Sequence, residues 1–318
     1  MRPEIPLPFL PVGGQAVIEG VMMRSPSKIA VAVRRYDGSV VAMEKPFVSI
    51  TRRIRVLGLP ILRGAVSLFE TLYLGITALN FSAEEASRGD DAAPLAKASA
   101  FQNIAQIVTM VLSFGVGILL FVVLPARITG WLGFKDRIGF GLVDGFFRLL
   151  AFVLYLVLIS QWKELARVLG YHGAEHKAIH ALENRAPLTP ESVQSFTRFH
   201  PRCGTSFLFL VVLVSIVVFT FIGKPRGIGD HLLRIACMPL IAGVAFEFIR
   251  LSGRYADRPF VKALVWPGLQ FQRLTTREPD LSMCEIAIAA LERVRGDEVV
   301  VALERSETMA PAEVAFVQ

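Results

Sequence analysis

Charged residues are scarce in this sequence. Asp, Glu, Lys and Arg make up 19% of its 318 residues, whereas 53% are hydrophobic. Soluble domains carry about a quarter charged residues, and the apolar residues here are gathered in blocks, which favours a membrane protein. The charge that remains is basic, with a formal net value of +7. Because basic residues beside membrane spans retain loops in the cytoplasm and contact anionic headgroups, we expect the lipid bilayer, and no nucleic acid, as the partner of this basic surface.

Cysteine is scarce as well. Cys203, Cys237 and Cys284 lie far apart in the chain, and an odd number at wide spacing argues against a disulfide framework. The stretch 1–11 is rich in proline and has no basic segment before an apolar core. We therefore expect no cleavable signal sequence.

Four apolar stretches reach the roughly 20 residues that a helix needs to cross a bilayer core of about 30 Å. They lie at 104–124, 142–162, 206–222 and 232–249. A fifth stretch, 59–81, contains Pro60, Arg63 and Glu70. Polar residues recur in it at helical spacing, which is typical of an interfacial or re-entrant helix. The sequence predicts a mainly α, polytopic membrane protein with about four transmembrane helices plus this interfacial or re-entrant helix.

The distribution of Lys and Arg predicts the sidedness. With four spans, the N-terminal region, the loop at 163–204 and the tail share one side, and they hold most of the basic residues. We expect these parts in the cytoplasm and the protein in the inner (cytoplasmic) membrane. The predicted units are a β-containing N-terminal unit, an interfacial helix with its linker, a four-helix transmembrane domain and a C-terminal tail, at 1–58, 59–100, 101–250 and 251–318.

A small cytoplasmic β-hairpin unit is predicted near the N-terminus. The runs 29–33 and 39–43 are rich in residues that favour strands, and they flank Asp37 and Gly38. An Asp-Gly pair suits a tight turn with positive φ. The sequence therefore predicts one hairpin ahead of the membrane helices.

A glycine-rich segment precedes this hairpin. Gly13, Gly14 and Gly20 lack the lysine and the spacing of phosphate- or dinucleotide-binding loops. We expect a tight turn that leads into a strand. Glu19 and Arg24, in the same segment, are candidates for contact with a lipid headgroup or with the metal site described next.

The strongest candidate for chemistry is an H-x-x-E-H string formed by His172, Glu175 and His176. In a helix the two histidines lie one turn apart on one face. They can then bind one divalent metal ion, with Zn²⁺ the expected ion, while the carboxylate activates water. This is the inverted zincin pattern. The alternative is an interfacial helix whose histidines bind backbone or lipid phosphate. His180 is about 12 Å along the axis from His172 and is not expected to share the ion.

A second cluster, His200 and Cys203, comes just before the third apolar stretch. The pair is suited to supply two further ligands to the same metal. Two alternatives stay open, a Cys203 nucleophile activated by His200 and a turn that merely ends the loop.

Glu247, near the end of the fourth stretch, is a functional candidate because an intramembrane carboxylate is costly. It is a candidate metal ligand, with an ion pair to Arg250 as the alternative.

Five strings in the chain together resemble the YqhQ-like membrane proteins, the family known as domain of unknown function 1385. The strings are 13–24, 60–64, 172–179, 200–206 and 274–279. The resemblance implies a bacterial multi-span membrane protein, with related forms in plastids. It also implies a metal-dependent enzyme built on the same His and Glu positions, and it implies no particular substrate.

Three functions are open at this point. The first is a membrane-embedded metallohydrolase that acts on a membrane-anchored peptide or a lipid headgroup at the cytoplasmic face. The second is a non-enzymatic scaffold or regulator with a structural metal, and the third is a transporter. A catalytic metal site keeps one position open, whereas a structural site is closed. Convergence of His172, His176, His200 and Cys203 would favour the scaffold, and three ligands with Glu175 left free would favour the hydrolase.

Overall fold

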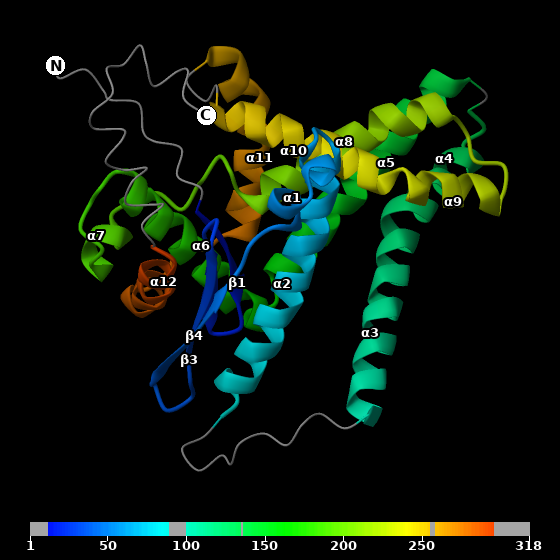
Figure 1. Ribbon diagram of the computed structural model, residues 1–318. Helices are drawn as coiled ribbons and strands as arrows, with labels where there is room; N and C mark the ends of the chain where they lie inside the picture. The colour runs from blue at the N-terminus through cyan, green and yellow to red at the C-terminus, as the bar shows by residue number, and fades with distance from the viewer. Residues whose placement is uncertain (1–11, 89–99, 135, 255–257, 296–318) are drawn as a thin grey trace.

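The computed structural model describes residues 12–88, 100–134, 136–254 and 258–295 (Figure 1). These residues are mostly helical, with one antiparallel sheet near the N-terminus. The strands lie side by side in chain order as β1 (Gly13–Val17), β2 (Gly20–Arg24), β3 (Lys28–Arg34) and β4 (Val40–Pro46). The helices are α1 (Ile50–Arg53), α2 (Leu62–Ala86), α3 (Ala100–Ile118), α4 (Leu124–Trp131), α5 (Arg137–Ser160), α6 (Lys163–Glu183), α7 (Pro190–Gln194), α8 (Gly204–Ile222), α9 (Ile228–Ala236), α10 (Met238–Arg254), α11 (Pro259–Thr275) and α12 (Leu281–Val294). A 3₁₀ turn, η1 (Arg55–Gly58), precedes α2, and a π-helical turn, η2 (Leu119–Val123), joins α3 to α4.

The sheet consists of two hairpins joined in register. The predicted hairpin is confirmed as β3 and β4, and Gly38 has the expected positive φ of 84° in its turn. The glycine-rich segment forms a further hairpin, β1 and β2, which turns at Glu19 with a φ of 49°. The sequence predicted a single strand after a turn here, because β1 is too short and too rich in glycine to show strand periodicity.

The sheet is covered on both faces. In Figure 1 it lies between α12 on one side and α2 on the other. Alternate residues of a strand point to opposite faces, and β3 uses both. Ala30 and Ala32 pack with buried residues of α6 and α12. Val31 and Val33, on the opposite face, pack with Leu74 of α2. The N-terminal strands are therefore the middle layer of a core that also contains α6 and α12.

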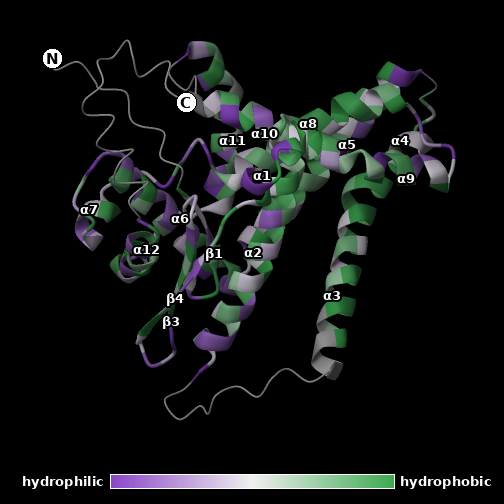
Figure 2. Cartoon of the chain, viewed as in Figure 1, coloured by the Kyte–Doolittle hydropathy of each residue, from purple (hydrophilic) through white to green (hydrophobic). Residues whose placement is uncertain are grey.

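Five helices of the described chain are long and apolar enough to cross a membrane. They are Leu62–Ala86, Ile107–Trp131, Arg137–Ser160, Gly204–Ile222 and Ile228–Ser252. Four of them coincide with the predicted spans. The additional one is α2, which was predicted to be interfacial or re-entrant and which meets the same criteria of length and composition. Figure 2 shows α5 and α8 as almost wholly hydrophobic, whereas hydrophilic residues recur along α2.

Helix α2 continues beyond its predicted end at residue 81 because its last turns are bound to the sheet. Ser82 accepts a hydrogen bond from the backbone N–H of Ile18 at 3.2 Å. Glu85 accepts one from Nε of Arg35 at 2.8 Å. These contacts extend the helix to Ala86, into the stretch that the sequence predicted as the linker after this helix.

The other end of α2 packs among the apolar helices. A Cβ atom added to Gly64 would lie 2.8 Å from Cα of Gly243 in α10, so the two backbones are in direct contact. Small residues allow apolar helices to approach this closely. Helix α2 therefore connects the two parts of the molecule, with its first turns on α10 and its last turns on the sheet.

Candidate metal centre

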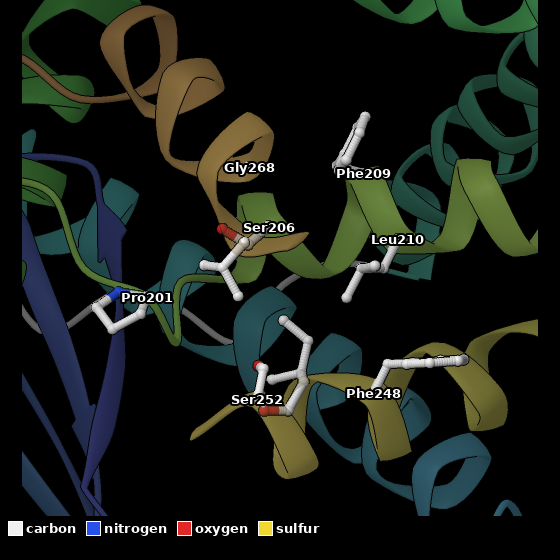
Figure 3. Close-up of a pocket in the computed structure, with 9 residues that line it drawn as sticks. Pro201, Ser206, Phe209, Leu210, Phe248, Ser252 and Gly268 are labelled. Carbon is white, nitrogen blue, oxygen red and sulfur yellow. Dashed lines mark hydrogen bonds between the residues drawn. The ribbon is translucent and has the colours of Figure 1, made fainter. Parts of the chain in front are cut away.

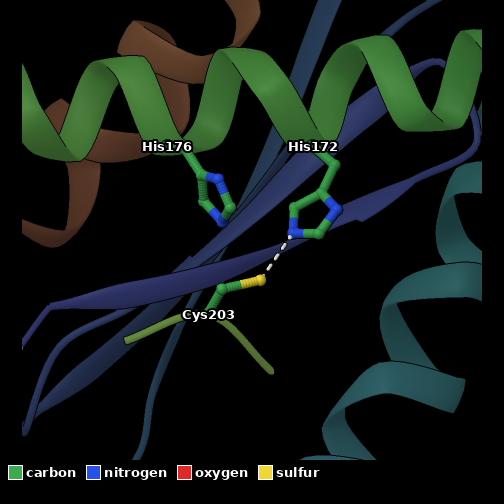
Figure 4. Close-up of side chains that lie close together, drawn as sticks. All are labelled: His172, His176 and Cys203. Atoms are coloured by element: carbon green, nitrogen blue, oxygen red, sulfur yellow. Dashed lines mark hydrogen bonds between the residues drawn. The ribbon is translucent and has the colours of Figure 1, made fainter. Parts of the chain in front are cut away.

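Helix α6 carries both histidines of the H-x-x-E-H string on one face, as predicted. The rings of His172 and His176 are 4.5 Å apart between centroids. Sγ of Cys203, the residue that caps the N-terminus of α8, lies 3.3 Å from Nε2 of His172. Figure 4 shows the three side chains directed toward one another from α6 and from the turn before α8. Their ligand atoms all lie within 4.8 Å of one another, so three metal donors converge on one point.

Hydrogen bonds on the far side of each imidazole determine which nitrogen faces this point. Nδ1 of His172 is 2.7 Å from the carbonyl oxygen of Thr275. Nδ1 of His176 is 2.5 Å from the carbonyl oxygen of Arg198. A carbonyl oxygen only accepts, so Nδ1 carries the proton in both rings and Nε2 presents its lone pair. Metal-binding histidines characteristically donate their second N–H in this way.

The turn that carries Cys203 is held by two hydrogen bonds from Gln272 of α11. Gln272, which is fully buried, accepts a hydrogen bond from the backbone N–H of His200 at 2.8 Å and donates one to the carbonyl oxygen of His200 at 2.7 Å. The turn closes where the N–H of Cys203 donates to the same carbonyl at 3.3 Å. The sequence analysis missed Gln272, because α11 also carries Lys262, Gln270 and Arg273 and no local signal distinguishes the one buried glutamine among them.

Glu175 lies beside the three donors. Its Oε2 is 4.0 Å from Nε2 of His172 and 3.5 Å from Nε2 of His176. Burial raises the pKa of this carboxyl, and the opposing influences include His172, His200 and the backbone N–H of Gly14, which donates to the carboxylate. Strand β1 therefore forms one wall of the site.

Close approach of β1 to Glu175 requires a glycine. A Cβ atom on Gly14 would lie 2.6 Å from the carbonyl oxygen of Met22 and 2.9 Å from Cγ of Glu175. Neither distance is tolerable for a real side chain. The glycine-rich segment thus serves a packing purpose, and the structure connects it to the histidine motif some 160 residues away in the chain.

His200 belongs to a second group and is turned away from the first. Its Nδ1 accepts the backbone N–H of Arg202 at 3.3 Å, so Nε2 carries the proton and donates to Oε2 of Glu183 at 3.4 Å. His180, Glu183 and His200 form this second group, whose ligand atoms also lie within 4.8 Å. Burial lowers the pKa of His180 to about 4 and also lowers that of His200. Because the guanidinium of Arg202 is ion-paired with Glu183, a cation in this group would compete with a positive charge already present.

Glu247 lies outside both groups. Its carboxylate forms an ion pair with Arg63 of α2 and accepts the backbone N–H of Ile61 at 3.3 Å. The structure therefore gives this carboxylate an ion-pair partner on another helix, in place of the Arg250 pair that the sequence suggested. The sequence could not indicate this partner, because the two residues are 184 positions apart.

Glu19 and Arg24, the two candidates from the glycine-rich segment, lie at different places in the structure. Glu19 binds Arg167 of α6 at 2.5 Å, away from the histidines. Arg24 binds Glu70 of α2 at 3.3 Å and lines the same cavity as the metal donors. Only Arg24 of this pair is therefore placed to act on a ligand near the site.

A cavity of about 480 Å³ opens beside the metal donors. His172, Glu175, His176 and Cys203 form one side of it, together with neighbouring residues that include His200 and Arg202. Residues in and around β1, β2, α1 and α2, with Phe246 of α10, form the opposite side. A volume of this order is typical of small-molecule sites. A second pocket, between α8, α10 and α11, is lined by Ser206, Phe209 and Phe248 among others (Figure 3) and holds about 10 Å³, enough for a single water molecule.

The fold and the site define a mainly helical chain with five helices apolar enough to cross a membrane, and with a His-His-Cys group in which His176 and Cys203 are buried. The family model described as "Protein of unknown function (DUF1385)" matches residues 59–297. "Uncharacterized protein YqhQ" of Bacillus subtilis (strain 168) is 32% identical over 294 residues, which cover 89% of this chain and 91% of that protein. The chain therefore belongs to the DUF1385 family, and the resemblance found in the sequence is confirmed. No solved structure matches the chain.

Proposed function

We propose that this protein is a membrane-embedded metallohydrolase. His172, His176 and Cys203 would hold one divalent ion, and Glu175 would act as general base. The observation that carries the proposal is the convergence of three oriented donors at the wall of an open cavity. Catalytic metal sites combine three protein ligands with an open position, whereas structural sites are closed. Because His200 is turned toward Glu183, the ligand count supports a hydrolase over the alternative of a scaffold or regulator with a structural metal.

The donor set fits Zn²⁺. Two imidazole nitrogens and one thiolate are ligands of this borderline-soft ion, whereas Mg²⁺ and Ca²⁺ take oxygen ligands. Nε2 of both histidines is deprotonated by virtue of the Nδ1 hydrogen bonds, which is the state that metal binding needs. A bound divalent ion would supply Lewis-acid chemistry at this point.

Glu175 and Gly14 would have separate roles in the proposed hydrolysis. Water and substrate enter from the cavity, and Glu175 takes a proton from the water as it attacks the electrophilic centre of the substrate. The bond to the leaving group breaks, and Glu175 returns the proton to that group. The N–H of Gly14 fixes the orientation of the carboxylate, so the base is positioned before the substrate arrives.

The topology that we propose has four crossings. Strand β1 packs on α6, so the sheet and α6 share a side of the membrane, and an even number of crossings must separate them. Three candidate helices lie between them in the chain, and α2 is the one that does not cross, since Leu74 and Ser82 bind the sheet. The crossings are then Ile107–Trp131, Arg137–Ser160, Gly204–Ile222 and Ile228–Ser252. The excess of Lys and Arg in the remaining parts supports a cytoplasmic site in the inner membrane.

Metal analysis tests the proposed site. Protein purified without chelators should contain about one Zn²⁺ per chain, as expected for a site with three protein ligands. His176→Ala and Cys203→Ala should each abolish the bound metal. His231→Ala, which removes a histidine outside both ligand groups, is the matched control and should retain it. A wild-type protein without stoichiometric metal would refute the proposed metal site.

Glu175→Gln separates the hydrolase from the scaffold. A general base can be replaced without loss of the ion, so this variant should retain its metal by mass spectrometry of the digested protein. Loss of the ion to the same extent as in His176→Ala would make Glu175 a fourth ligand. The site would then have four protein ligands and no open position, and a scaffold or regulator with a structural metal would replace the hydrolase as the proposed function.

A further inference from the structure

The cavity beside the metal donors is lined by three arginines from three separate elements. Arg24 comes from β2, Arg52 from α1 and Arg202 from the turn before α8. Glu175, on the side of the metal donors, is the one carboxylate among the described residues that line it. Guanidinium groups recognise phosphate and carboxylate oxygens through paired N–H donors. Arg24 and Arg202 already have carboxylate partners, Glu70 and Glu183. What the wall offers an anionic ligand is therefore the remaining guanidinium N–H donors, and not an excess of positive charge.

A single buried carboxylate positions two of these arginines. Glu70 of α2 binds Arg24 at 3.3 Å, and it also accepts the backbone N–H of Ile50 at 2.7 Å, at the start of the helix that carries Arg52. The guanidinium of Arg24 also lies over the ring of Phe47, 4.4 Å from its centroid. The ion pair uses Nη2 of Arg24, and a guanidinium has five N–H donors. Arg24 can therefore be held in place and still donate to a ligand.

Hydroxyl groups complete the polar wall. They are donors to the oxygens of an anion, and phosphate is commonly bound by arginines together with serine and threonine. The cavity-lining hydroxyl residues are Ser25, Ser49, Thr51, Ser67 and Thr71. Three oxygens on a phosphate can use this number of donors, whereas a carboxylate offers two.

The edge of the cavity carries an apolar surface beside its arginines. Ile50, Ile54 and Val56, in and around α1, expose 46%, 50% and 61% of their surface. Arg53 and Arg55 alternate with them along the chain. Exposed apolar residues interspersed with arginine are typical of a segment that lies in the headgroup region of a bilayer. The cavity therefore opens where the acyl part of an amphiphile can remain in the membrane.

We propose that this cavity binds the phosphate group of an amphiphilic substrate between Arg24, Arg52 and Arg202. The substrate class of the metal centre would then be a phosphate-bearing headgroup, and this part of the inference rests on the proposed function. Recognition of phosphate by the arginines does not depend on the metal. A soluble phosphate compound offers the same chemistry, so the source of the phosphate is an arm of the test.

Calorimetric titration of the purified protein in a nonionic detergent tests the proposal. The probes are dihexanoyl phosphatidic acid, whose phosphomonoester has three terminal oxygens, its phosphate-free counterpart dihexanoylglycerol, and inorganic phosphate. The phosphate-bearing lipid should bind, and Arg52→Gln should weaken its binding about tenfold, the effect of losing one charged hydrogen-bond donor. Arg53→Gln removes the same charge from the same helix outside the cavity lining and should change the affinity by less than about twofold.

The outcomes separate the possibilities. Tighter binding of the lipid than of inorganic phosphate supports a headgroup, and equal binding supports a soluble phosphate compound. Equal binding of dihexanoylglycerol, or equal weakening by the two arginine variants, overturns the proposal. Repeating the titration with His176→Ala distinguishes this proposal from the metallohydrolase. If neither the wild-type protein nor any variant holds metal but the lipid still binds through the arginines, the phosphate site is supported and the metallohydrolase is rejected. If the wild-type protein holds metal but binds no phosphate, the phosphate site is rejected and the metallohydrolase is still supported.

Discussion

Gly13 and Gly14 are adjacent in β1 but have different surroundings. Nothing lies within 4 Å of a Cβ atom built on Gly13, whereas one on Gly14 meets the backbone of β2 and the side chain of Glu175. Backbone and buried side chains cannot withdraw cheaply from such an overlap. At the scale of single residues, Gly14 thus links the N-terminal sheet to the proposed catalytic carboxylate.

Gly14→Ala should therefore destabilise the protein and displace Glu175. Overpacking of this kind costs about 1–3 kcal/mol, which thermal unfolding in detergent can detect. Gly13→Ala is the matched control and should unfold at the wild-type temperature or slightly above it. Equal unfolding temperatures for the two variants would contradict the contact between β1 and α6.

At the scale of elements, the crossing of α2 and α10 holds the sheet and the apolar helices together. Gly64 and Gly243 bring the two backbones into contact, and the ion pair of Arg63 with Glu247 lies at the same crossing. Because Ser67 and Thr71 of α2 line the cavity, the position of this helix also determines the shape of the site.

Gly64→Ala should separate the two helices. Its Cβ atom would lie 2.7 Å from Cβ of Phe246 and 2.8 Å from Cα of Gly243, so we expect a lower unfolding temperature and a lower affinity for the ligand of the cavity. Gly117→Ala in α3 has nothing within 4 Å of its Cβ atom and should be neutral or stabilising, since alanine favours helix by about 1 kcal/mol over glycine. Destabilisation by Gly117→Ala alone would contradict this assignment.

At the scale of the whole molecule, the packing of the sheet on α6 constrains the path that we propose for the chain through a membrane. The proposed topology places the hairpin turn at Asp37 and the start of α7 at Glu191 on one side. Lys224, in the turn between α8 and α9, lies on the other. A cysteine introduced at one of these positions at a time should report this arrangement when labelled from each side of sealed vesicles. The unsubstituted chain, with its three native cysteines, is the control for background labelling. Labelling of Asp37→Cys and Glu191→Cys from opposite sides would mean that α2 crosses the membrane.

Local patterns in the sequence predicted much of the fold and half of the site. The Asp-Gly turn predicted the β3–β4 hairpin, and the apolar stretches predicted four of the five long helices. Helical spacing placed His172 and His176 on one face of α6. These features depend on residues within a few turns of one another, and propensity and periodicity report such short-range relations directly.

The sequence by itself determined many of the elements, the family and the residue types suited to a metal. The tertiary structure decided which of them meet. It placed Cys203 with His172 and His176, turned His200 toward Glu183, paired Glu247 with Arg63, and brought Gly14 against Glu175. Each of these contacts joins segments that only packing brings together, and each depends on side-chain direction. A hydrogen bond at one ring nitrogen decides what the other can bind, and no spacing along the chain encodes that bond.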